Sequence, residues 1–201
     1  YLVAAELSGI PATLVLNKAD LIDEELRPFI DDMKAMYERL GYPVLELSAH
    51  DPAGLTPLHE ALKGKTCVFV GQSGVGKSSL VNAVLPDAEL DVGDLSANSG
   101  LGQHTTVTAR LFHLPTGGEL IDSPGIREFG LWHISEEELL HGYRELSELA
   151  GYCKFRNCSH RNEPGCAFLD AADSGAISEE RLANFFQIAD TLDEEGRDRY
   201  Q

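Results

Sequence analysis

The chain has 201 residues and a formal net charge of −17, from 16 lysines and arginines against 33 aspartates and glutamates. Hydrophobic residues make up 43% of it and charged residues 24%, a globular composition that excludes disorder throughout. No apolar run of about 18 residues and no signal peptide is visible, so we expect no membrane-spanning helix and no membrane partner. The first residue is Tyr1 rather than methionine, which suggests a piece of a longer protein.

Apolar strands alternate with helical stretches along the chain, which is typical of an α/β domain with a mostly parallel sheet. The expected strands are 13–16, 44–47, 66–70, 107–114 and 119–121. The expected helices are 24–40, 55–62, 78–85, 178–192 and one that follows Ser135, a capping residue with acidic residues after it. The helix over 24–40 carries an apolar face made of Leu26, Phe29, Ile30, Met33, Met36, Tyr37 and Leu40.

The alternation of apolar strands and helices ends near residue 135, and a helix start, a cluster of cysteines and a final helix follow. We therefore divide the chain into an α/β domain over residues 1–134 and a small helical domain over residues 135–201. Residues 87–105 are rich in Asp, Gly, Ser and Asn and are expected to form a long functional loop.

The strongest motif is a glycine-rich stretch that matches G-x-x-x-x-G-K-[ST] between an apolar strand and a helix. This context predicts a P-loop, whose backbone N–H groups surround phosphate oxygens. Lys77 is then expected to contact the β- and γ-phosphates, and the Ser78 hydroxyl to bind Mg²⁺. The predicted phosphate-binding residues are Gly71, Gln72, Ser73, Gly74, Val75, Gly76, Lys77, Ser78 and Ser79.

Two motifs that end earlier strands point to guanine as the base. Asn17-Lys18-Ala19-Asp20 resembles the N-K-x-D motif of GTPases, in which the carboxylate accepts hydrogen bonds from two N–H donors of guanine. Adenine would leave that carboxylate poorly paired. Ser48-Ala49-His50 resembles the S-A-K element, in which a backbone N–H contacts the guanine carbonyl, although histidine replaces the lysine.

Asp122-Ser123-Pro124-Gly125 resembles the D-x-x-G motif, in which Asp122 approaches Mg²⁺ through water and Gly125 senses the γ-phosphate. Ile126 follows, where many GTPases have a glutamine that orients the attacking water. In the long loop, Thr105 or Thr106 is a candidate Mg²⁺ ligand, and the spacing does not choose between them. His104 is either a catalytic group that positions water or an ordinary loop histidine.

Three cysteines and a histidine follow one another closely in the C-terminal part. Cys153, Cys158, His160 and Cys166 suit one tetrahedral, structural Zn²⁺ per chain, whereas Cys67 stands alone and is expected in the core. Lys154, Arg156 and Arg161 lie in the same stretch against Glu163, which makes 151–166 the candidate local basic patch of an otherwise acidic chain.

The guanine motifs precede the P-loop here, whereas common GTPases have the reverse order. This order, the stretch Gly102-Gln103-His104-Thr105-Thr106 and the zinc cluster together resemble the circularly permuted bacterial GTPases known as ribosome small-subunit-dependent GTPase A. The resemblance implies a monomeric cytoplasmic GTPase that uses Mg²⁺ with GTP or GDP, assists late maturation of the small ribosomal subunit with its rRNA, and is stimulated by that subunit. It also implies an N-terminal OB-fold domain that this chain lacks.

Two other functions remain open from the sequence. Ile126 favours a nucleotide-gated RNA- or ribosome-binding protein with negligible hydrolysis. A P-loop ATPase is the second alternative, against which Asn17 and Asp20 argue.

Overall fold

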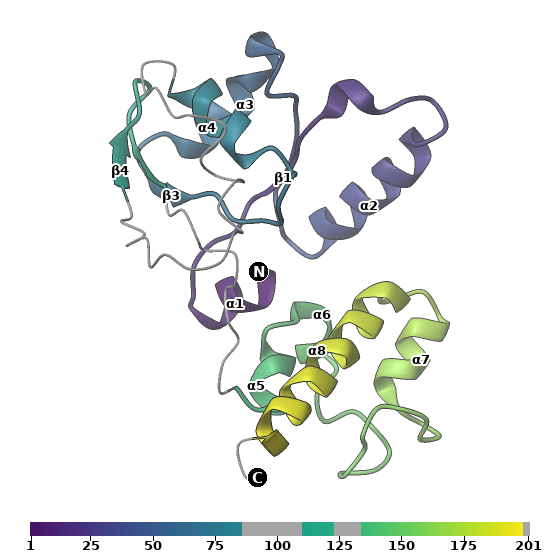
Figure 1. Cartoon of the computed structure of the whole chain (residues 1–201). Coiled ribbons are helices and arrows are strands. Elements are labelled where there is room, and N and C mark those ends of the chain that lie inside the picture. The colour runs from purple at the N-terminus through teal and green to yellow at the C-terminus, as the bar shows by residue number, and fades with distance from the viewer. Residues whose placement is uncertain (86–109, 123–133, 199–201) are drawn as a thin grey trace. The chain divides into compact units, whose positions relative to one another are not determined.

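The computed structural model describes residues 1–85, 110–122 and 134–198. The chain forms two compact units, each of which is described by itself (Figure 1). One unit comprises Thr13–Ala35 and Tyr42–Phe129, and we call it the nucleotide unit. The other comprises Tyr1–Ala12, Met36–Gly41 and Gly130–Gln201, and we call it the helical unit. The expected boundary between residues 134 and 135 stays a prediction.

The first sheet of the nucleotide unit is a parallel pair of short strands. β1 (Leu14–Leu16) pairs with β2 (Val44–Glu46) in a register that places Leu14 beside Val44. The 3₁₀ helix η1 (Ala19–Leu21) and the helix α2 (Arg27–Arg39) connect the two strands. Because both strands run in the same direction, their carboxyl ends, which carry the two predicted guanine motifs, lie at the same edge.

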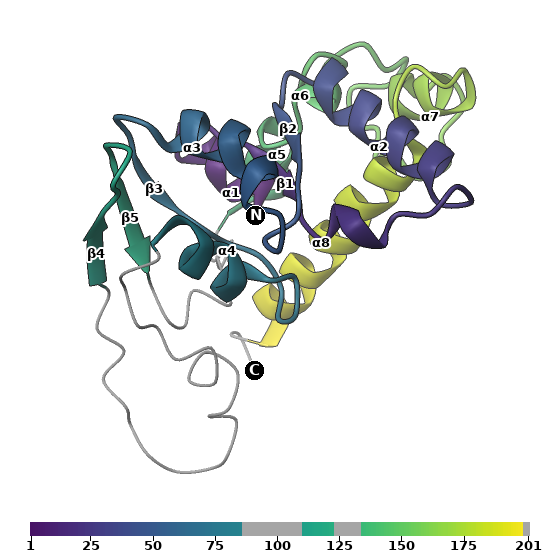
Figure 2. The same cartoon turned by 90° about the horizontal axis from the view of Figure 1, so that it is seen from above.

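The second sheet has three strands in the order β3-β5-β4, side by side in Figure 2. β3 (Thr66–Val68) is parallel to β5 (Glu119–Asp122), and β4 (Arg110–His113) is antiparallel to β5. The expectation of a mostly parallel sheet therefore holds for β1, β2, β3 and β5, while the β4–β5 hairpin is antiparallel because a tight turn joins its strands.

Three further helices of the nucleotide unit enclose an aliphatic core. They are η2 (Pro52–Leu55), α3 (Thr56–Leu62) and α4 (Lys77–Val84). Leu120 of β5 is fully buried among the leucines and valines of α3 and α4. Cys67 is half-buried against this core, and burial raises the pKa of its thiol. It is therefore a packing residue, as expected.

The helical unit is built from short helices around one long helix. The helices are α1 (Leu2–Leu7), α5 (Glu136–His141), α6 (Arg144–Ser147), α7 (Ala167–Asp173) and α8 (Glu179–Asp198). Leu139, Phe168 and Phe185 are buried at its centre. α1 contacts the end of α5 so closely that a Cβ on Gly142 would lie 2.5 Å from Val3 Cγ1. Among the described residues, no helix is both long and apolar enough to cross a bilayer.

Polar contacts fix the helical unit in two places. Ser135 and Glu138 form a capping box at the start of α5, which confirms the expected cap, and the hydrogen bonds from Ser135 lower the pKa of the Glu138 carboxyl. The buried Arg181 guanidinium pairs with the buried Glu145 carboxylate and lies over the ring of Tyr143. Burial raises the pKa of Tyr143 to about 12.

Some element boundaries differ from those expected. The helix expected over 24–40 begins at Arg27, and residues 24–26 form a turn that leads into it, where the Asp23 carboxylate accepts a hydrogen bond from Leu26 N at 2.9 Å. No residue of α2 is fully buried; Ile30, Met33, Met36 and Tyr37 of the expected apolar face are half-buried, whereas Phe29 is exposed. β3 ends at Val68 rather than residue 70, and α8 continues past residue 192. The helices α1, α6 and α7 were not predicted.

Candidate nucleotide site and metal centre

The glycine-rich loop follows β3 and leads directly into α4. Gly76 precedes the helix with φ 91°, and no side chain caps the first turn. A Cβ at this position would lie 2.2 Å from the side-chain nitrogen of Asn17, so only glycine fits here. A glycine-rich loop that leads directly into a helix start is the arrangement that a phosphate-binding loop requires.

The ammonium group of Lys77 lies inside this loop. Its Nζ donates to the carbonyl oxygen of Gly71 at 2.6 Å and to that of Gln72 at 2.7 Å. The loop backbone thus holds the positive charge next to the N–H groups at the helix start. Ser78 and Ser79 follow in the first turn of α4, half-buried.

Asn17 joins the three predicted nucleotide motifs. Its side-chain nitrogen donates to the carbonyl of Val75 at 3.1 Å, and its side-chain oxygen accepts from Ala49 N at 3.1 Å. Lys18, with φ 65°, donates from Nζ to the carbonyl of Gly74 at 2.9 Å. The sequence predicted these residues from separate motifs, and the structure brings them into direct contact.

Asp20 follows Lys18 and Ala19 in the same motif and has an exposed side chain. A hydrogen bond from the buried Ser48 holds the pKa of the Asp20 carboxyl below its usual value, and the charge of Lys18 lowers it further. Asp20 is therefore an ionised, accessible acceptor near neutral pH. This is the electrostatic property that recognition of two N–H donors on guanine requires.

The remaining predicted nucleotide residues lie partly outside the described residues. Asp122 ends β5, whose residue Ile121 pairs with Val68 of β3, so the backbone of Asp122 lies at the sheet edge from which the P-loop departs. Ser123 to Gly125, Ile126 and the loop residues His104, Thr105 and Thr106 lie outside the described residues, and their predicted roles stay predictions.

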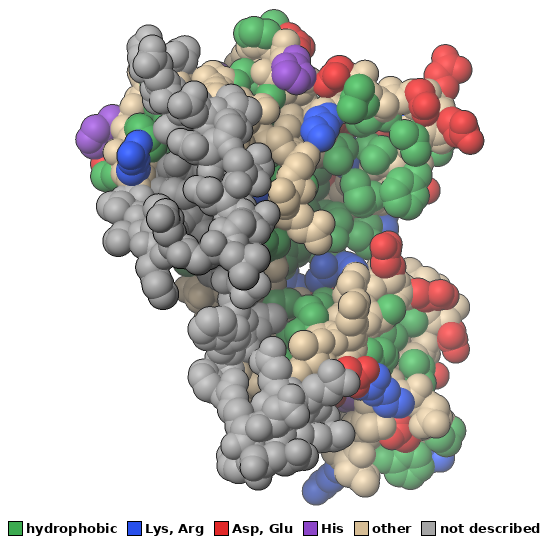
Figure 3. All heavy atoms as spheres, viewed as in Figure 1, with side chains coloured by type: hydrophobic (Ala, Val, Ile, Leu, Met, Phe, Trp, Pro, Cys, Tyr) green, Lys and Arg blue, Asp and Glu red, His purple; other side chains and the backbone are tan. Residues whose placement is uncertain are grey.

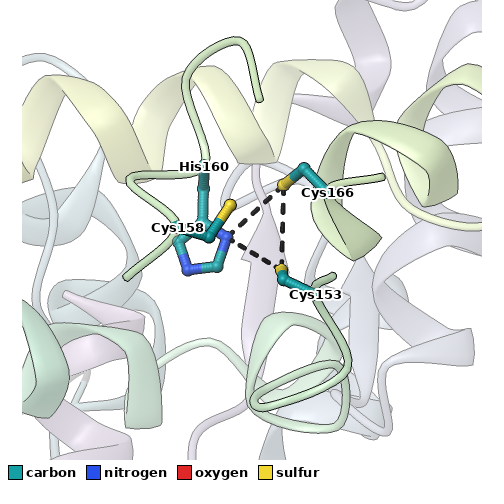
Figure 4. Close-up of side chains that lie close together, drawn as sticks. All are labelled: Cys153, Cys158, His160 and Cys166. Atoms are coloured by element: carbon teal, nitrogen blue, oxygen red, sulfur yellow. Dashed lines mark hydrogen bonds between the residues drawn. The ribbon is translucent and has the colours of Figure 1, made fainter. Parts of the chain in front are cut away.

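The four predicted metal ligands converge in the helical unit (Figure 4). Their ligand atoms all lie within 4.8 Å of one another. His160 Nδ1 is 3.4 Å from the sulfur of Cys153 and 3.4 Å from that of Cys166, and these two sulfurs are 3.9 Å apart. Tetrahedral Zn²⁺ with Zn–S bonds of about 2.3 Å places its sulfurs roughly 3.8 Å apart. The donor set and its spacing therefore fit zinc.

Comparisons with known proteins agree with this geometry. The family model described as RsgA GTPase matches residues 1–132. The chain belongs to the RsgA GTPase family.

Curated relatives in this family are longer than the chain. The small ribosomal subunit biogenesis GTPase RsgA of Alcanivorax borkumensis is 80% identical over 200 residues, and the protein of that name from Pseudomonas fluorescens strain Pf0-1 is 55% identical over 196 residues. These matches cover 100% and 98% of this chain but 57% of each relative. The chain thus spans little more than half the length of these relatives.

Solved structures confirm the fold. The crystal structure of YjeQ from Thermotoga maritima matches with a TM-score of 0.76 and 36% identity, over 95% of this chain and 63% of that chain. The structure of YloQ, described as a circularly permuted GTPase, matches with a TM-score of 0.75 and 31% identity, over 96% of this chain and 61% of that chain. The expected circularly permuted arrangement of an α/β GTPase domain is therefore confirmed.

Two residues that sequence reasoning missed organise the metal ligands. The ring of Phe168 stacks on that of His160 with centroids 3.9 Å apart. The Glu163 carboxylate accepts hydrogen bonds from the Ser159 hydroxyl and from the backbone nitrogens of Ser159 and Arg161, and the bonds from Ser159 are the main reason that its pKa is lowered to about 2. An acidic residue inside a short loop between ligands was the available signal for Glu163; nothing in the sequence singled out Phe168.

The surroundings favour the metal-binding forms of His160 and Cys153, whereas burial raises the pKa of the Cys158 thiol. Burial lowers the pKa of His160, which keeps its imidazole neutral and able to bind a metal. Ala167 N donates to the sulfur of Cys153 at 3.3 Å, a contact that stabilises a thiolate. Cys166 is fully buried and directly precedes α7, so the metal site and the start of that helix are one structural element.

Removing the metal is expected to unfold residues 150–170, because a segment this short has little core of its own. Protein purified without chelator should contain one zinc per chain by elemental analysis. A chelator, or Cys153→Ser, should then abolish protection of this segment in hydrogen exchange. Cys67→Ser is the matched control and should retain the zinc. Protein that contains no zinc would contradict the assignment.

Proposed function

We propose that this protein is a GTPase that assists maturation of the small ribosomal subunit, binding it in the GTP state and leaving after hydrolysis. The observation that carries the proposal is the contact of Asn17 with both the P-loop and Ala49, beside the ionised Asp20. This arrangement supports a guanine nucleotide with its phosphates on the P-loop. The relatives named as small ribosomal subunit biogenesis GTPases supply the partner.

The chemistry requires little more than positioning and charge neutralisation. When bound with the nucleotide, Mg²⁺ neutralises charge that develops on the phosphates. Ser78 in the first turn of α4 and Asp122 at the end of β5 would hold it, with Thr105 or Thr106 as a further ligand. Lys77 would act on the β- and γ-phosphates, and zinc would remain a structural ion in the helical unit.

We propose that the basic stretch around the metal site, residues 151–166, contacts rRNA. Lys154 and Arg156 are exposed there, and Tyr152 and Phe155 are exposed by 78% and 43%. Basic side chains next to accessible rings suit phosphates and unstacked bases. We further propose a monomeric protein that acts in the cytoplasm.

The direct test is GTP hydrolysis measured with and without purified small ribosomal subunits. Stimulated release of phosphate is expected. Binding to the subunits in the GTP state without turnover would favour the alternative of a nucleotide-gated binding protein, which Ile126 supports because isoleucine cannot orient water. Equal affinity for ATP and GTP would favour an ATPase instead.

Exchanging Asp20 for asparagine is expected to weaken GTP and GDP binding about 10- to 100-fold, because a good bidentate base contact contributes about 1–3 kcal/mol. The preference for GTP over ATP should fall accordingly. Titration with fluorescent nucleotides measures both affinities. Asp32→Asn, at an exposed position of α2, is the matched control and should bind GTP normally. Unchanged GTP affinity in Asp20→Asn would contradict the assignment of Asp20 as the residue that recognises guanine.

A further inference from the structure

An exposed apolar surface follows the guanine-reading loop in the nucleotide unit. Leu21, Leu26 and Phe29 lie close together in the sequence, and they are exposed by 67%, 48% and 62%. Figure 3 shows hydrophobic side chains gathered over the region of α2, with acidic side chains at the edge. Phe29 lies in α2, Leu26 directly precedes it and Leu21 ends η1, and we call these three exposed residues the α2 surface. Single exposed leucines are ordinary, but a group of bulky apolar side chains with a polar rim is typical of an interaction site.

Local hydrogen bonds hold this surface in shape. Asp23 accepts from Leu26 N through its carboxylate and from Arg27 N through its carbonyl, at 2.9 and 3.1 Å. Ile30 N then donates to the carbonyl of Leu26 at 3.1 Å, which continues the helical turn. Leu26 and Phe29, three residues apart in this turn, therefore share one face.

The helix that carries this face is fixed to the sheet. The Glu46 carboxylate of β2 accepts from Arg27 at 2.8 Å and from Lys34 at 2.6 Å, and both cations lower the pKa of that carboxyl. A surface anchored in this way loses little conformational entropy when a partner binds.

The rim of the α2 surface is strongly acidic. Between residues 20 and 32 the chain has six exposed carboxylates, and Arg27 is the only basic residue of this stretch. Its guanidinium is already shared between Glu46 and Asp31. The exposed carboxylates are Asp20, Asp23, Glu24, Glu25, Asp31 and Asp32. Such a rim repels RNA, anionic lipid and a second copy of this acidic chain, and attracts a cationic partner.

We propose that the α2 surface docks a lysine- and arginine-rich protein segment that carries a bulky apolar anchor, supplied by a protein of the small ribosomal subunit. The proposal rests on the proposed function, which brings the chain to an assembly whose proteins bind RNA through basic segments. The apolar anchor packs against Leu26 and Phe29, where the binding energy concentrates. The acidic rim steers the basic residues and sets the orientation.

Binding of purified small subunits in the presence of a non-hydrolysable GTP analogue tests the surface. Phe29→Ser should weaken binding on the order of tenfold, the usual effect of removing an apolar anchor. Glu24→Lys with Glu25→Lys should weaken it by a factor that shrinks at high salt. Leu111→Ser, at a residue of β4 that is 52% exposed, and Asp173→Lys, at an exposed position in α7, are the matched controls. All variants should bind GTP normally, which shows that they are folded.

A photo-crosslinking amino acid in place of Phe29 identifies the occupant. We expect it to capture a basic segment of a subunit protein. Capture of rRNA, of a second copy or of this protein's own residues would overturn the docking surface, as would undiminished subunit binding by Phe29→Ser. A wild-type protein that binds no subunits would overturn the proposed function and the docking surface together.

Discussion

Replacing Lys77 with alanine is expected to reduce GTP hydrolysis by about 10²–10³-fold, the usual effect of removing one preorganised electrostatic group. The carbonyls of Gly71 and Gln72 hold its ammonium inside the P-loop. The ammonium therefore already lies in the loop predicted to bind the β- and γ-phosphates, whose negative charge must be neutralised during phosphoryl transfer. Phosphate release under single-turnover conditions, with and without small subunits, measures the loss.

The matched control for this variant is Lys63→Ala, which removes an exposed lysine at the end of α3. It lowers the net charge equally and should hydrolyse GTP at the normal rate. Guanine recognition by Asp20 should survive in Lys77→Ala, so nucleotide binding at high concentration separates a catalytic defect from misfolding. Hydrolysis at the wild-type rate in Lys77→Ala would remove the P-loop assignment.

The nucleotide site was largely predictable from the sequence because its residues sit at the ends of strands. A parallel sheet brings such ends to one edge, so the P-loop and the guanine motif could be assigned before their contacts were known. The contacts themselves were not predictable. Nothing in the sequence indicates that Asn17 bonds to both Val75 and Ala49, since residues this distant meet only through the fold.

The grouping of segments was also hidden from the sequence. Arg144 donates to the Leu40 carbonyl at 2.9 Å and to the Glu6 carboxylate at 2.7 Å, so both the start of the chain and residues 36–41 belong to the helical unit. These contacts join residues more than a hundred positions apart, and periodicity carries no information at that range. α7 escaped prediction because it begins directly after Cys166 and is too short for a helical period to show.

The apolar face of α2 shows a different limit of pattern reasoning. A run of apolar residues at helical spacing favours a face that packs on a core. In the structure Phe29 is 62% exposed, and no residue of the helix is fully buried. Periodicity reports that a face is apolar but not what covers it. A partner outside the chain satisfies the same pattern, and the acidic rim around Phe29 favours this interpretation.

His104→Ala is expected to leave GTP binding nearly normal and to reduce subunit-stimulated hydrolysis by about 10²–10⁴-fold, the range for general base catalysis or water positioning. The reason lies in the sequence, because Ile126 stands where many GTPases orient water with a glutamine. His104 is the only imidazole in the segment 102–106, which we expect to close over the γ-phosphate when GTP and the subunit are bound. The partner would then stimulate turnover by favouring the closed loop, a population shift that needs no new chemical group.

His113→Ala is the matched control for this variant. It removes a histidine whose side chain is 81% exposed on β4, and it should leave turnover unchanged. Rapid-quench kinetics at saturating subunits measures the rate. Full stimulated turnover in His104→Ala would make His104 an ordinary loop residue and leave the water to the backbone or to the ribosomal subunit.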